Sequence, residues 1–222
     1  MSELQRALLI VGSPRGREST SQSLGTHLMA RLSEHGWQTD AIVLREKVAS
    51  QAGLDEVADA ARAADLVVLA QPLYVDSLPA LVVRALEHLV TRDIGHGQSL
   101  VAIVNCGFPE AEHTDLALRI CELFARQAGF RWAGGLALGM GEAVAARPLA
   151  EAGAMVHNVV RALDLSAGAL AGGEDIPGEA RALMRKPFIP AGLYRWMGNS
   201  SWKRQARRNG VTEPLIARPY AE

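Results

Sequence analysis

Short apolar runs alternate with helical segments along most of the chain, and this alternation restricts the fold more than any other feature of the sequence. Runs such as "ALLIV" and "LVVLA" are typical of strands that are covered on both faces of a parallel sheet. The sequence therefore predicts an α/β fold with a five-stranded parallel sheet and helices on both of its faces. We expect the strands at residues 7–11, 37–44, 66–70, 100–105 and 132–138.

The segments between these runs carry helical signals. Leu24, Leu28 and Leu32 fall on one helical stripe, and Gly36 follows as a stop signal. Asp55 precedes an alanine-rich segment and is a candidate N-cap. We expect helices at residues 19–35, 55–64, 79–90 and 114–128 and over much of 148–170.

Length and composition favour a soluble protein. About half of the 222 residues are hydrophobic and 21% are charged, so the chain can bury the core of one α/β domain with an appendage. No apolar run approaches the roughly 20 residues that a membrane-spanning helix needs. The first apolar run leads directly into a glycine turn, without the small-residue cleavage site of a secretory peptide. We therefore expect a cytoplasmic location.

Signals for disulfides and metals are weak. Cys106 and Cys121 are the only cysteines, and they form no CxxC pair. The six histidines are scattered without the spacing of metal ligands. We expect two buried, reduced thiols and no metal site.

The charge is unevenly distributed. Residues 180–212 contain eight Lys and Arg residues and no acid. Because the whole chain has a net charge of −1, the remainder carries −9. We expect a main domain at residues 1–175 and a basic, aromatic-containing, helical C-terminal extension at 176–222, which could face phosphate, lipid or an acidic neighbouring subunit.

The predicted topology limits where a ligand can bind. In an open sheet with the strand order 2-1-3-4-5, ligands gather beyond the carboxyl ends of the strands, next to the point where the order reverses. This rule selects three loops, at residues 12–21, 71–77 and 105–109.

The first loop lies in the stretch "LLIVGSPRGRESTSQSL" and has the composition of an anion site. Gly12 permits close backbone approach, Arg15 offers a planar charged donor, and a helix that begins near Ser19 points unpaired amides at the turn. The spacing matches neither G-x-x-x-x-G-K-[ST] nor G-x-G-x-x-G, because Pro14 stands where the second glycine of the latter would be. The loop predicts a phosphomonoester site, and the alternative is an ordinary helix cap with a solvated arginine.

The other two loops offer surfaces for a flat ring. In "QPLYVDSLP", Tyr74 supplies an aromatic surface, and Asp76 is a helix cap or, alternatively, a proton donor or acceptor. In "NCGFPE", Gly107 permits close backbone approach and Phe108 can cover an apolar ligand. Cys106 has no basic neighbour in the sequence, so a catalytic thiol is not favoured.

These three motifs, in this order after the first, third and fourth strands, resemble the NAD(P)H-dependent FMN reductase and multimeric flavodoxin group of flavodoxin-like flavoproteins. The resemblance extends over roughly the first 140 residues. The tail "GLYRWMGNSSWKRQARRNG" also resembles the C-terminal extension of some members. The cysteine cluster of the related iron–sulfur flavoproteins is absent from the sequence.

The resemblance implies a flavodoxin-like fold, bound FMN, and NADPH or NADH as hydride donor. It implies no catalytic side chain, since the flavin carries the chemistry. It places the phosphate on Ser13, Arg15, Ser19, Thr20 and Ser21. It places the ring against Pro72, Leu73, Tyr74, Val75, Asp76 and Ser77 and against Asn105, Cys106, Gly107 and Phe108. We expect residues 73–76 to act more through backbone amides than through side chains.

The function implied is an FMN-dependent NAD(P)H oxidoreductase that reduces a quinone, a nitro or azo compound, or free flavin. A flavodoxin-type electron carrier without nicotinamide turnover is one alternative. Another is a membrane-surface sensing or binding protein that uses the basic tail, although the segment from Gly198 to Ser201 is expected to interrupt any continuous amphipathic helix there. The resemblance also implies a homo-oligomer, in the simplest case a dimer. We expect it to bind a small-molecule acceptor and no nucleic acid.

Overall fold

The structure is a computed structural model that describes residues 4–144 and 147–211. Internal contacts divide the chain into two units, Met1–Phe188 and Ile189–Glu222, which are considered separately. The predicted boundary between a main domain at residues 1–175 and an extension at 176–222 stays a prediction.

The first unit is built on a five-stranded parallel sheet with the order β2-β1-β3-β4-β5, as predicted. The chain forms β1 first, places β2 on one side of it and then places β3 on its other side. The strand order therefore reverses between β1 and β3. The strands are β1 (Arg6–Val11), β2 (Gln38–Val43), β3 (Leu66–Pro72), β4 (Ser99–Asn105) and β5 (Arg131–Leu138).

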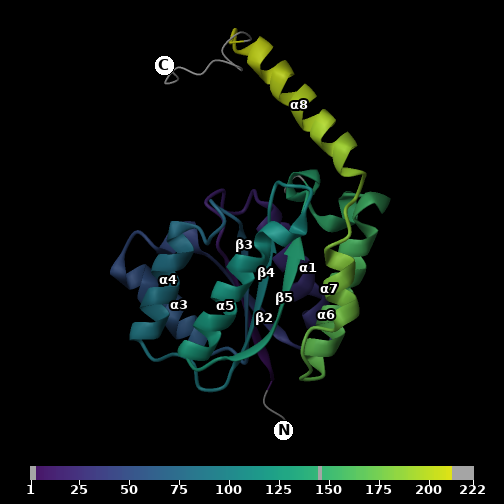
Figure 1. Cartoon of the computed structure of the whole chain (residues 1–222). Coiled ribbons are helices and arrows are strands. Elements are labelled where there is room, and N and C mark those ends of the chain that lie inside the picture. Colours follow the sequence, from purple (N-terminus) through teal and green to yellow (C-terminus); the bar gives the residue numbers. More distant parts are fainter. Residues whose placement is uncertain (1–3, 145–146, 212–222) are drawn as a thin grey trace. The chain divides into compact units, whose positions relative to one another are not determined.

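Helices cover both faces of this sheet (Figure 1). One face packs against α1 (Thr20–Glu34), α6 (His157–Ala171) and α7 (Gly178–Met184), and the other against α3 (Gln51–Arg62), α4 (Ala80–Thr91) and α5 (Asp115–Gln127). A short helix, α2 (Leu44–Lys47), follows β2. Alternate residues of β1, β3 and β4 enter the two cores, which explains the continuous apolar run in the middle of each of these strands.

Helix α1 approaches the sheet closely. Leu24, Leu28 and Leu32 are fully buried, as the stripe predicted. A Cβ atom at Gly25 would lie 2.4 Å from Leu9 Cδ1, so glycine lets the helix pack directly on β1. This packing fixes the height of the helix N-terminus above the sheet.

Two helix boundaries differ from the sequence prediction. Helix α3 starts at Gln51, because the Ser50 hydroxyl accepts a hydrogen bond from Gly53 N at 3.1 Å and caps the helix. The predicted cap Asp55 instead lies inside α3. The helix expected over much of 148–170 is α6, which begins at His157. Two short 3₁₀ turns, separated by Gly153 with φ of 71°, precede it.

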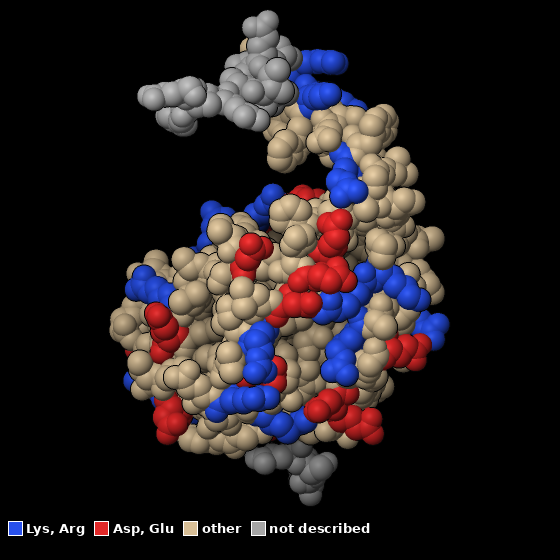
Figure 2. Space-filling model, in the orientation of Figure 1, with Lys and Arg blue, Asp and Glu red and all other residues tan. Residues whose placement is uncertain are grey.

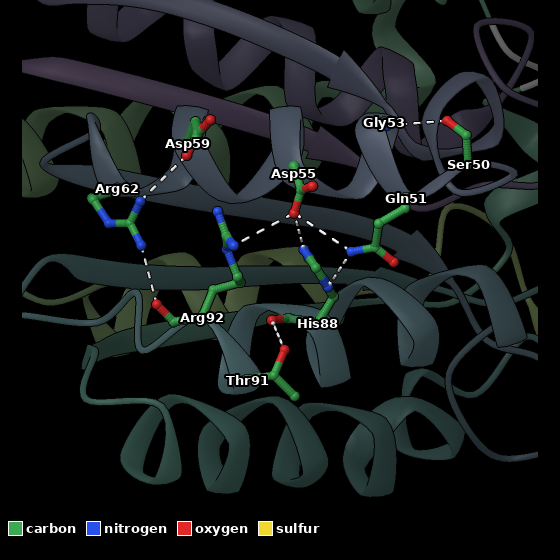
Figure 3. A network of polar contacts seen from close by, with 9 residues as sticks. All are labelled: Ser50, Gln51, Gly53, Asp55, Asp59, Arg62, His88, Thr91 and Arg92. Atoms are coloured by element: carbon green, nitrogen blue, oxygen red, sulfur yellow. Dashed lines mark hydrogen bonds and ion pairs between the residues drawn. The ribbon is translucent and has the colours of Figure 1, made fainter.

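Asp55 joins α3 to α4 through a polar network (Figure 3). Its carboxylate lies 2.9 Å from His88 Nε2 and 3.8 Å from Arg92 Nε. On the same helix, Arg62 donates to the carbonyl oxygen of Arg92 at 3.1 Å. The residue predicted to begin a helix as its N-cap therefore joins two helices instead.

The core under β3 holds a thiol and an amide. Cys121 on α5 is fully buried, and its Sγ accepts a hydrogen bond from Gln71 Nε2 at 3.3 Å. Burial is the main cause that raises the pKa of the Cys121 thiol to about 12, and the Gln71 hydrogen bond partly opposes it. The predicted buried, reduced thiol is confirmed at this position, and burial favours its protonated form.

This pKa makes stability sensitive to alkaline pH. Above pH 9 the unfolded chain releases the thiol proton while the folded chain retains it, so the free energy of unfolding falls with rising pH. Between pH 9 and 10.5 we expect the wild type to lose about 2 kcal/mol more than Cys121→Ala. Urea unfolding of both proteins at the two pH values measures the difference, and equal losses would contradict the assignment.

Candidate functional site

An open cleft of about 110 Å³ lies beyond the carboxyl ends of β1, β3 and β4. Eleven of the fifteen predicted site residues line it, together with Glu142, which the sequence analysis did not select. The lining residues are Ser13, Arg15, Ser19, Thr20, Ser21, Pro72, Leu73, Tyr74, Asn105, Cys106, Gly107 and Glu142. The three loops therefore meet at one place, next to the point where the strand order reverses, as expected for an open parallel sheet.

The loop between β1 and α1 is held tightly against β3. Gly12 N donates to the carbonyl oxygen of Ala70 at 2.8 Å, and a Cβ atom at Gly12 would lie 2.4 Å from Val82 Cγ2. Ser19 caps α1, because its hydroxyl accepts from Gln22 N at 3.2 Å and donates to Gly16 O at 2.7 Å. The predicted helix cap is therefore present, and it belongs to the same loop as the residues predicted to bind an anion.

Two further hydroxyls of this loop connect it to its neighbours. Thr20 Oγ1 donates to Gly141 O at 2.9 Å, and Ser21 Oγ donates to Asn105 Oδ1 at 2.8 Å. These hydroxyl protons are committed to protein acceptors. The amides of Thr20 and Ser21, in the first turn of α1, have no partner within the helix and remain the donors that this turn can offer to an anion.

Arg15 contributes the positive charge at the cleft. Its guanidinium lies 3.3 Å from a carboxylate oxygen of Glu142, and the two side chains are 65% and 64% exposed. Glu142 belongs to a 3₁₀ turn (Gly141–Ala143) that follows β5. The sequence signal for it was the run "GMGE" at the carboxyl end of a fifth strand that ends at the same edge.

The loop after β3 divides into a lining part and an outer turn. Pro72, Leu73 and Tyr74 line the cleft. Tyr74 and Ser77 then exchange two backbone hydrogen bonds of 3.0 Å across Val75 and Asp76, whose φ angles are 49° and 55°. These two central residues and Ser77 are not among the lining residues. Asp76 is not a helix cap, because Pro79 occupies the N-cap position of α4.

Backbone amides of this loop are partly used within the protein. Leu73 N donates to Asn105 O at 2.8 Å and Tyr74 N to Ser77 O. Of the four amides predicted to face a ligand, two are therefore engaged in fixing the loop.

The loop after β4 supplies Asn105, Cys106 and Gly107 to the cleft, whereas Phe108 is exposed and packs against the His113 ring at 4.6 Å between centroids. Burial raises the pKa of the Cys106 thiol, and the nearby carboxylates of Glu110 and Glu112 act in the same direction. Both effects favour the protonated thiol, which is the less reactive form.

Comparison with known proteins identifies the family. The sequence profile of the NADPH-dependent FMN reductases matches residues 5–119, slightly more than half of the chain. The chain belongs to this family. Comparison with curated protein sequences finds no match.

Solved structures of low sequence identity share the fold of this family member. An FMN-dependent NADH-azoreductase from Bacillus anthracis, solved with FMN, is 14% identical with a TM-score of 0.57, over 76% of this chain and all of that one. An apo NADH:FMN oxidoreductase is 19% identical with a TM-score of 0.55, over 84% and 96% of the two chains. An oxidoreductase from Corynebacterium diphtheriae is 17% identical with a TM-score of 0.55, over 82% and 98%. The flavodoxin-like fold predicted from the sequence is confirmed.

The second unit of this FMN reductase family member contains α8 (Ala191–Arg208). The helix runs without a break through Gly198, so the predicted interruption there is wrong. Trp196 and Trp202 are exposed, but a separation of six residues places them about 120° apart around the helix. The helix carries basic side chains (blue in Figure 2) and has no single apolar stripe of the kind that lies on a membrane.

Other kinds of site find no support in the described residues. Within residues 4–144 and 147–211, no group of three or more His, Cys, Asp or Glu side chains could hold a metal ion. No helix in that part of the chain is long and apolar enough to cross a membrane.

The outer turn of the β3–α4 loop makes a prediction about stability. Val75 is 98% exposed and has a positive φ, which a β-branched residue adopts only with strain. Asn tolerates this conformation, so Val75→Asn should stabilise the protein by roughly 1 kcal/mol. Thermal and urea unfolding check the value. Val83→Asn on α4 is the control and should bring no gain, and a destabilised V75N would contradict the strain.

Proposed function

We propose that this family member is an FMN-dependent NAD(P)H oxidoreductase that passes electrons from a nicotinamide through FMN to a small acceptor, namely a quinone, a nitro or azo compound, or free flavin. The observation that carries the proposal is the convergence of an arginine, a helix N-terminus and two further loops in one cleft of a member of the FMN reductase family.

The donor set of the cleft fits a phosphate monoester. Arg15 supplies a guanidinium, and the first-turn amides of Thr20 and Ser21 lie at the positive end of the α1 dipole, where no acidic residue occurs in the first turn. Ser13 Oγ accepts a hydrogen bond from Arg15 N at 3.3 Å, which leaves its own proton to donate. In this proposal Ser19 orients the helix end, and the hydroxyls of Thr20 and Ser21 join the loops.

The two remaining loops would hold the flavin ring. Pro72, Leu73 and Tyr74 line the cleft from the loop after β3, and Asn105, Cys106 and Gly107 line it from the loop after β4. Contacts of the ring with Val75, Asp76, Ser77 and Phe108 stay a prediction. When bound, FMN supplies hydride acceptance from the nicotinamide and electron transfer to the acceptor. The protein residues therefore need only bind and orient it and limit the access of water.

The size of the cleft supports a homo-oligomer. Its volume of about 110 Å³ is below the roughly 300–1,000 Å³ of typical ligand pockets. Tyr74, Val75 and Phe108, on the two loops that line it, expose apolar surface. A second subunit, in a dimer, would cover this surface and enclose the ligand.

Flavin binding tests the proposal. Purified protein with added FMN should show a shifted visible spectrum and quenched flavin fluorescence, and NADPH or NADH should bleach the bound flavin without air. Arg15→Gln should weaken FMN binding about tenfold or more, because a charge-assisted bond to phosphate is lost. A spectrum identical to that of free FMN would overturn the proposal. Binding without bleaching by either nucleotide would favour the electron carrier.

Vesicle binding tests the remaining alternative for α8. Because its apolar side chains are spread around the helix, we expect no co-sedimentation with phosphatidylserine vesicles at physiological salt. A variant with Lys203, Arg204 and Arg207 changed to Gln should bind FMN as the wild type does. Sedimentation of the wild type that this variant loses would instead favour the membrane-surface protein.

A further inference from the structure

We propose that Glu142 competes with the phosphate of a flavin nucleotide for the guanidinium of Arg15 and thereby shortens the time that the nucleotide stays in the cleft. This inference rests on the proposed function. It assigns a role in nucleotide release to an acidic residue that lines the cleft and pairs with its arginine.

The turn that carries Glu142 is anchored on both neighbouring loops. Gly141 N donates to Cys106 O at 2.8 Å, and Gly141 O accepts from Thr20 Oγ1 at 2.9 Å. Met140 N donates to Phe108 O at 2.7 Å. The backbone that presents Glu142 is therefore fixed by the same loops that line the cleft.

Strain in this turn also shows that its conformation is imposed. Met140 is fully buried and has φ of 56°, a conformation that a non-glycine residue keeps only where its surroundings dictate it. A Cβ atom at Gly141 would lie 3.0 Å from Cys106 O and 3.1 Å from Asn105 Nδ2, so the next position favours glycine. Glu142 follows directly, and its carboxylate reaches Arg15 from this fixed base.

Carboxylate and phosphate are alternative partners for one guanidinium. Both are anions that the planar donors of arginine bind with paired hydrogen bonds. The Arg15–Glu142 pair is about two-thirds exposed, so water screens it and a phosphate can displace the carboxylate. The displaced carboxylate still lines the cleft and repels the bound phosphate. Both effects favour release, and differences in affinity of this kind are expressed mainly in dissociation rates.

A second ion pair of the same loop provides a matched control. Arg17 Nε lies 3.1 Å from Glu46 Oε1, and this pair is similarly exposed. Neither residue lines the cleft. Glu46→Gln therefore removes one negative charge that pairs with an arginine of the loop between β1 and α1, and it leaves the residues that line the cleft unchanged.

The test compares the wild type, E142Q, E46Q, R15Q and R15Q/E142Q. Stopped-flow fluorescence measures FMN dissociation, and titration with inorganic phosphate, followed by the amide NMR signals of the α1 N-terminus, measures the anion site alone. E142Q should slow FMN release and tighten phosphate binding about three- to fivefold. E46Q should change neither by more than about twofold. In the R15Q background the effect of E142Q should shrink, since the shared partner is gone.

The outcomes separate the two proposals. If the wild type binds FMN and E142Q releases it as fast or faster, the competition is overturned and the proposed function stands. If none of the proteins binds FMN, the proposed function fails, and the inference fails with it. An equal effect of E46Q would show a general charge effect and would also overturn the role of Glu142.

Discussion

The parallel pairing of β1, β3, β4 and β5 is the constraint on which the site depends. The register sets Val11 beside Ala70, Pro72 beside Asn105, and Asn105 beside Leu138. The ladder continues past the strand ends, because Gly12 N donates to Ala70 O, Leu73 N to Asn105 O, and Cys106 N to Leu138 O. The first residues of three loops are therefore placed by the same hydrogen bonds that form the sheet.

The height of α1 above this edge is the second fixed quantity. The close approach of Gly25 to Leu9 sets the helix axis, and the Ser19 cap sets its first turn. Ser21 is completely buried and bonded to Asn105, so the helix start is tied to the end of β4. A site that needs the amides of one helix turn beside two loops is thus preorganised by packing and buried hydrogen bonds.

Much of the fold and most of the candidate site could be predicted from the sequence because both depend on periodic burial. The apolar runs defined the strands, and the rule for open sheets then selected three loops whose residues do meet in one cleft. The predictions failed where two local sequence signals were equally good and tertiary contacts decided between them. Ser50 and Asp55 are both good N-cap residues. Ser50 begins α3, whereas Asp55 lies inside the helix and contacts His88, and the local sequence does not show this tertiary contact. Glu142 was not selected because the rule was applied to the loops after the first, third and fourth strands and not to the loop after the fifth.

The pattern of burial across the cleft separates its rigid part from its exchangeable part. Ser13, Ser19, Ser21 and Asn105 are buried, and the hydrogen bonds of Ser19, Ser21 and Asn105 lie within the protein, so the floor keeps its geometry whether or not a ligand is present. Arg15 and Glu142, by contrast, are mostly exposed and joined by a single ion pair. Rearranging an exposed pair costs little, whereas opening the floor would leave buried polar groups unsatisfied. An anion that enters the cleft would therefore exchange partners at the rim, while the loops that define its position stay where the sheet has put them.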